Sequence, residues 1–312
     1  MDINRSRVDS WKTDIEDSVD YYNNWFMEFA PPTFKEARRN AMKDVNKAFR
    51  LFGKSSELSV AMLAAEFPIL PILRQMTCPP LARDRLAGLS KVSSTFVKRL
   101  EDSPCSACGN DEEKRIIDVI KRLLDVDLFP FLKNTGNSSS PAQRNRAALI
   151  VADRLCGALS DPLIRNEQER RQLSAISDWL HKKKYELSKA KNHMELKPGE
   201  FAYHLNVKVA LQENEPRTVN IPVDVAIMPK SARKGDLPLI MEAKSAGDFA
   251  NVNKRRKEEA QKISQLRRTY GEVSFVLFLC GYFDAGYLGY EASEGIDWIW
   301  EHRIADMEKL GL

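Results

Sequence analysis

The 312-residue chain lacks the apolar run of about 20 residues that a membrane-spanning helix requires. Apolar residues are also few in the opening segment MDINRSRVDSWKTDIEDSVD, which carries several acids and no apolar stretch. Such a segment resembles neither a secretory signal nor a transit peptide. We therefore expect a cytoplasmic protein without a membrane partner.

Cysteine and histidine are both scarce, with five and four residues respectively. An odd number of cysteines in a large chain without an export signal favours reduced thiols over disulfides. Cys105 and Cys108 have the spacing of a zinc knuckle, but a structural zinc needs four ligands and no second pair lies nearby in the sequence. Zinc is therefore not expected.

No charge of one sign dominates, because the net charge is +4 and the pI is about 8.7. This mild basic balance permits nucleic-acid binding without establishing it. The 43% hydrophobic and 29% charged content is typical of a soluble globular protein and excludes a mostly disordered chain. The length leaves room for two domains.

Apolar residues at three- and four-residue intervals predict that the first 195 or so residues are nearly all helical. One helix is expected from 8 to 29, where Pro31 and Pro32 would end it. Thr33 and Glu36 have capping-box spacing and would open a second helix ending near 52. Further helices are expected at about 57–66, 82–100, 112–127, 142–159 and 166–190.

After Pro198 the apolar period changes to two, which indicates β-strands. Strands are expected at 201–209, 218–228, 237–244 and 273–280, and helices at 251–270 and 296–310. Pro222 favours an edge position or a bulge in the second strand. We predict an α+β fold: a helical domain over 1–195 and a second domain over 196–312 with a mixed sheet flanked by helices.

Three polar residues fall inside the second and third strands. Asp224 lies between two valines, where a carboxylate is costly to bury unless it binds something. Glu242 and Lys244 are two residues apart, so a strand places both side chains on one face. Hydrolysing a phosphodiester needs a metal held by oxygen ligands and a group that positions water. The carbonyl of Ala243 is a further candidate metal ligand beside Asp224 and Glu242.

An acid on one strand followed by Glu-x-Lys on the next resembles the core of the PD-(D/E)xK nucleases. The alternative is a structural ion pair between Glu242 and Lys244 at a strand end. The sequence departs from the superfamily pattern at one point, because Val223 separates Pro222 from Asp224.

A wider resemblance spans most of the chain, in segments 78–89, 241–260 and 279–292. These segments resemble the XamI-type restriction endonucleases. We therefore predict that 196–312 is the PD-(D/E)xK catalytic core and that the helical domain 1–195 serves DNA recognition or dimerisation. The resemblance implies a Type II enzyme that cuts both strands of a short palindrome, with a hexamer such as GTCGAC suggested, and leaves 5′-phosphates. It implies Mg²⁺, with Mn²⁺ as a possible substitute, and Asp224, Glu242 and Lys244 as catalytic residues. A cognate DNA methyltransferase encoded nearby is expected, and a palindrome is matched economically by a homodimer.

Basic and amide side chains follow the acidic motif and are candidate contacts to double-stranded DNA. They are Asn251, Asn253, Lys254, Arg255, Arg256, Lys257, Lys262, Arg267 and Arg268. Arg83 and Arg85 are further candidates, and a solvated helix face is the alternative reading of each cluster. Two other functions stay open: a repair, recombination or modification-dependent nuclease of the same superfamily, and a non-catalytic DNA-binding regulator.

Overall fold

The structure is a computed structural model. It describes residues 2–52, 58–103, 109–132, 140–210, 217–233, 235–250 and 252–312. They form two compact units, one of Met1–Phe29 with Arg165–Leu312 and the other of Ala30–Ile164. The first of these units thus includes helical segments from before residue 195. The assignment of functions to 1–195 and 196–312 stays a prediction. None of the helices in the described ranges is both long and apolar enough to span a bilayer.

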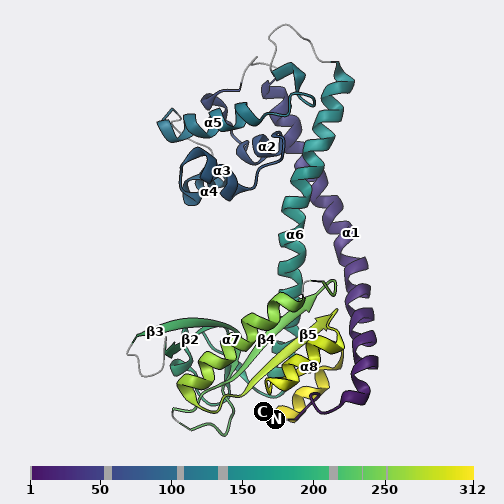
Figure 1. The fold of residues 1–312 in the computed structure, drawn as a ribbon, viewed down its shortest axis with the longest axis vertical. Helices are drawn as coiled ribbons and strands as arrows, with labels where there is room; N and C mark the ends of the chain where they lie inside the picture. The colour runs from purple at the N-terminus through teal and green to yellow at the C-terminus, as the bar shows by residue number, and fades with distance from the viewer. Residues whose placement is uncertain are drawn as a thin grey trace. The chain divides into compact units, whose positions relative to one another are not determined.

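Two long helices each contribute to both units (Figure 1). Helix α1 spans Trp11–Phe52 with Pro31 and Pro32 inside it, and α6 spans Pro141–Lys182 with Pro162 inside it. The predicted breaks near 31 and between 159 and 166 are therefore wrong, and the predicted helix 166–190 ends eight residues early. An interior proline costs about 3 kcal/mol, but burial of the flanking turns stabilises a helix more than propensity does. The buried residues nearest these prolines are Ala30 and Ala37 in α1 and Cys156 and Ser160 in α6.

The unit of residues 30–164 also contains short helices around an apolar core. They are η2 (Val60–Ala64), α2 (Leu70–Gln75), α3 (Arg83–Ser90), α4 (Ser94–Asp102), α5 (Asp111–Leu123) and η3 (Pro130–Leu132). The single helix predicted over 82–100 is two helices. Lys91 ends α3 with a left-handed φ of 54°, and the Ser93 side chain caps α4 by accepting a hydrogen bond from Phe96 N.

The other unit is built on one six-stranded mixed sheet, which confirms the α+β prediction. Its strands are β1 (Glu186–Leu187), β2 (Glu200–Ala210), β3 (Thr218–Ile227), β4 (Leu239–Ala246), β5 (Phe275–Gly281) and β6 (Asp297–Trp300). They lie in chain order across the sheet. The pairs β2–β3 and β3–β4 are antiparallel, and β1–β2, β4–β5 and β5–β6 are parallel.

The end of the chain differs from the predicted helix over 296–310. Residues Asp297–Trp300 form β6, and a 3₁₀ helix, η5, follows over Glu301–Leu310. Helix α8 (Ala285–Ser293) was not predicted. All four residues of β6 are buried, and a short, fully buried run has the same pattern in a strand and in a core helix.

Helices cover both faces of the sheet. On one face α7 (Val252–Tyr270) and α8 pack through Ile263, Leu266 and Leu288, and both helices lie in front of the sheet in Figure 1. On the other face the end of α6 packs through Ile176 and Leu180. A strand residue that faces α7 therefore belongs to a different core cluster from its chain neighbours.

The β2–β3 hairpin changes faces at His204 and Asp224. Phe201 and Val225 belong to the core cluster on the α6 face, whereas Leu205 and Val223 belong to the cluster on the α7 face. The register stays constant through this point, but His204 adopts a left-handed φ of 49°. The uniform alternation predicted for 201–209 is therefore wrong. The change of face turns the outer hairpin toward α7.

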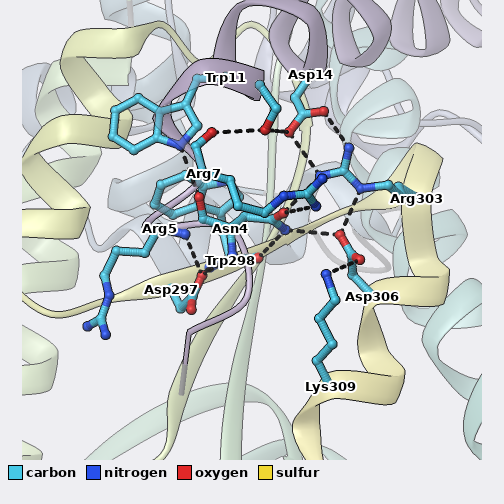
Figure 2. Close-up of polar contacts among 11 residues, drawn as sticks. Asn4, Arg5, Arg7, Trp11, Asp14, Asp297, Trp298, Arg303, Asp306 and Lys309 are labelled. Atoms are coloured by element: carbon cyan, nitrogen blue, oxygen red, sulfur yellow. Dashed lines mark hydrogen bonds and ion pairs between the residues drawn. The ribbon is translucent and has the colours of Figure 1, made fainter.

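Hydrogen bonds and an ion pair connect the N-terminal segment to β6 and η5 (Figure 2). The Asp297 carboxylate accepts backbone hydrogen bonds from Ile3, Asn4 and Arg5. Arg303 on η5 bonds Asp14 and also donates to Asp306 at 2.7 Å. These contacts hold the first turns of α1 against the sheet.

Candidate active site

The candidate site lies where β3 separates from β4. Ladder pairing between the two strands covers only Val225–Ile227 against Leu239–Met241. Just past that point the Ala243 N–H donates to the Asp224 carboxylate Oδ2 at 2.9 Å, instead of to a β3 carbonyl. The change of face in β3 thus places a carboxylate at the opening between two strands.

The three predicted side chains converge at this opening. Lys244 Nζ lies 3.0 Å from Glu242 Oε2 and 3.9 Å from Asp224 Oδ2. The two-residue spacing on β4 puts Glu242 and Lys244 on one face, as the sequence predicts. Glu242 is nearly fully buried, with its side chain 1% exposed, while those of Asp224 and Lys244 are 27% and 22% exposed. The cluster is therefore reachable through Asp224 and Lys244.

A second lysine from α7 completes the cluster. Lys262 Nζ lies 2.8 Å from Glu242 Oε1 and donates to the Pro222 carbonyl at 2.9 Å. That carbonyl is available because Pro222 lies in the part of β3 that pairs with β2 alone. The sequence placed Lys262 among nine DNA-contact candidates and gave no sign of its contact with Glu242. This residue is the main member of the site that sequence reasoning missed.

Burial and mutual charge set the ionisation of the cluster. Burial, reinforced by the neighbouring Glu242 carboxylate, raises the pKa of Asp224 above its ordinary value. Burial alone would lower the pKa of Lys244, but Glu242, Asp224 and Glu259 outweigh it and leave that pKa raised. Lys244 is therefore a cation at neutral pH, able to donate hydrogen bonds and unable to accept a proton.

A third carboxylate, that of Glu259 on α7, is buried close to Lys244. Glu259, one helical turn before Lys262 on α7, is 3% exposed and accepts a hydrogen bond from the Tyr287 hydroxyl at 2.7 Å. Burial raises the pKa of Glu259. Tyr287 is held by α8, whose N-cap Asp284 accepts from the Tyr287 N–H at 2.7 Å. The segment 279–292, one of the three that carry the family resemblance, thus holds Glu259 in place through the Tyr287 hydroxyl.

The donor set suits magnesium better than zinc. In the parts of the chain that the structure describes, no group of three or more His, Cys, Asp or Glu side chains could hold a metal. Asp224 and Glu242 supply two hard oxygen donors, and Mg²⁺ is commonly held by one or two carboxylates together with water and substrate phosphates. Cys105 and Cys108, the zinc candidates, lie outside the described residues.

The predicted DNA contacts are only partly described. Asn251 lies outside the described residues, and 253–257 lie on the first turns of α7, where only the backbone is described. In the other unit Arg83 pairs with Glu101 at 2.5 Å, while Arg85 is exposed. Arg85 is therefore the more accessible of these two arginines.

Two carboxylates beside two lysines at the opening of a sheet form a site suited to metal-dependent phosphodiester hydrolysis. The model of the XamI restriction endonuclease family matches residues 54–300. The Type II restriction enzyme SalI of Streptomyces albus G is 44% identical, over 99% of this chain and 99% of that enzyme. No solved structure matches the chain significantly. The chain belongs to the XamI restriction endonuclease family, which confirms the resemblance and makes the protein an endonuclease.

Proposed function

We propose that the protein is a Mg²⁺-dependent Type II restriction endonuclease whose catalytic residues are Asp224, Glu242 and Lys244. It hydrolyses the P–O3′ bonds of double-stranded DNA at a short palindrome and leaves 5′-phosphates. The observation that carries the proposal is the convergence of Lys244 Nζ on two carboxylates, at 3.0 and 3.9 Å. Membership of a restriction endonuclease family supports the same conclusion.

Asp224, Glu242 and the carbonyl of Ala243 would hold the metal. When bound, Mg²⁺ supplies charge neutralisation at the phosphate and lowers the pKa of a coordinated water. Ala243 contributes twice, because its N–H already fixes the Asp224 carboxylate at 2.9 Å. In the metal-free protein, the nearly buried Glu242 has both of its oxygens in ion pairs, with Lys244 and Lys262.

Lys244 would stabilise the charge that develops on the scissile phosphate and orient the attacking water. Its raised pKa keeps the ammonium protonated, so it acts as a donor and not as a general base. Arginine would not be equivalent, because its longer planar group differs in reach from a compact ammonium.

A palindrome presents two equivalent scissile phosphates, so two copies of the chain would supply the two sites required. We propose a homodimer on this ground, with the basic start of α7 and Arg85 contacting the DNA backbone. A methyltransferase encoded nearby would protect the host sequence, and no stable complex with it is needed.

Digestion of a sequenced plasmid, followed by mapping of the cut ends, tests the proposal. We expect discrete fragments with 5′-phosphate ends in Mg²⁺ or Mn²⁺ and intact plasmid in EDTA. A plasmid that contains GTCGAC and a matched one without it would test the suggested hexamer. Random degradation to a smear would favour the repair or recombination nuclease, and DNA binding without cleavage in any divalent ion would favour the regulator.

A further inference from the structure

Both oxygens of the Glu242 carboxylate are occupied by cations of the chain itself. Lys244 Nζ lies 3.0 Å from Oε2 and Lys262 Nζ lies 2.8 Å from Oε1. Together with Asp224 these groups are two carboxylates and two ammonium groups, so the formal charges of the four cancel, and Glu259 is a further buried carboxylate close to Lys244. The two ion pairs offset the cost of burying a carboxylate that is 1% exposed.

The balance conflicts with metal binding at the same carboxylate. A divalent cation bonds its oxygen ligands at about 2.1 Å and would add two positive charges to four groups whose formal charges cancel. An ammonium group on the same oxygen would repel the metal strongly at that distance. One of the two lysines must therefore give up its Glu242 oxygen when the metal binds.

Of the two lysines, Lys262 has the weaker set of contacts. Lys244 has a second carboxylate, Asp224, at 3.9 Å, and it shares strand β4 with Glu242. The other partner of Lys262 is the neutral carbonyl of Pro222, and its side chain reaches the site from a separate element, α7. If Lys262 leaves Glu242, it loses one contact with a carboxylate. If Lys244 leaves instead, it gives up its position between the carboxylates of Glu242 and Asp224.

We propose that Lys262 is an exchangeable cation of the active site. It pairs with Glu242 Oε1 in the metal-free enzyme, yields that oxygen when a divalent cation binds, and then contacts a phosphate of the bound DNA. The proposal rests on the proposed function above, because it takes Asp224 and Glu242 as the metal site. It makes Lys262 a positioning residue that couples metal binding to DNA binding.

Mn²⁺ binding to the full chain without DNA, measured by electron paramagnetic resonance of free Mn²⁺, tests the first half. We expect Lys262→Met to bind Mn²⁺ about tenfold more tightly than the wild type, which corresponds to about 1.4 kcal/mol. Lys262→Arg keeps the charge and should bind no more tightly than the wild type. Lys189→Met, which removes an exposed lysine between β1 and η4 (His193–Glu195), is the matched control and should change nothing.

Asp224→Asn, combined with each variant, separates this proposal from the function on which it rests. If Asp224→Asn weakens Mn²⁺ binding but Lys262→Met does not strengthen it, the exchange is wrong and the metal site stands. If no binding depends on Asp224, both proposals fail. Should Lys262→Met not fold, the arginine variant decides, because tighter binding by Lys262→Arg would overturn the exchange.

DNA binding in Ca²⁺ tests the second half. Each phosphate contact contributes about −0.9 to the slope of log affinity against log salt. Lys262→Met should therefore reduce the magnitude of that slope by about 0.9, while Lys189→Met leaves it unchanged. An unaltered slope in Lys262→Met would overturn the phosphate contact.

Discussion

Replacing Asp224 by Asn separates a catalytic carboxylate from a structural one. The isosteric amide keeps an oxygen to accept the Ala243 N–H, which now lies 2.9 Å from Oδ2. Only the charge is lost. At 3.9 Å the attraction between Lys244 and Asp224 is about 4 kcal/mol for an effective dielectric constant near 20. The raised pKa of Asp224 means that burial and the Glu242 charge outweigh this attraction.

Stability and activity should therefore respond very differently. The raised pKa means that ionised Asp224 does not stabilise the fold above its ordinary pKa, so its loss should change the unfolding free energy at neutral pH by no more than about 1 kcal/mol. Cleavage should fall at least 1000-fold, about 4 kcal/mol in activation free energy, because the substitution removes a proposed metal ligand. Urea unfolding and single-turnover plasmid cleavage measure the two quantities. Cleavage within tenfold of the wild type, or a stability loss above 3 kcal/mol, would refute the reasoning and favour a structural ion pair.

Substitutions at three further positions test the fold around the site. Gly281→Ala should destabilise by more than about 3 kcal/mol, because a Cβ there would lie 2.1 Å from the Ala246 carbonyl oxygen at a φ of +95°; a normal melting temperature would contradict this. His204→Val should cost about 1–2 kcal/mol in urea unfolding, since a β-branched residue is a poor fit to φ 49°, whereas His204→Gly should cost nothing. Burial would raise the pKa of Asp306, but hydrogen bonds from Lys309, Arg303 and Asn4 lower it. Ionised Asp306 therefore stabilises the fold above its ordinary pKa of 3.8, and this stability is lost as the pH falls through the lowered value; Asp306→Asn should cost about 1–3 kcal/mol at pH 7 and progressively less below pH 3.8, and a constant difference would count against this assignment.

The position of Glu242 and Lys244 on one face could be predicted because strand alternation is local, and Asp224 could be singled out although β3 changes face there. A two-residue period fixes which side chains share a face, and a charge among buried apolar residues is conspicuous. The burial of Glu259 is also indicated by a local pattern. It precedes the buried Ile263 and Leu266 by four and seven residues, so all three lie on one helix face.

The remaining features depend on tertiary contacts that no local pattern contains. The contact between Lys262 and Glu242 joins residues twenty apart on different elements. The continuous α1 and α6 pass through prolines because burial of the flanking turns outweighs local propensity. Strand β6 lies in a segment for which the sequence predicts a helix, because a four-residue buried run has no diagnostic period.

Anomalous diffraction from crystals of the protein soaked in Mn²⁺ tests most directly whether this opening in the sheet is a metal site. We expect a peak about 2.2 Å from carboxylate oxygens of both Asp224 and Glu242, with Lys262 displaced from Glu242 Oε1. A peak at another place in the protein, or none while both lysines remain on Glu242, would contradict the proposed catalytic centre.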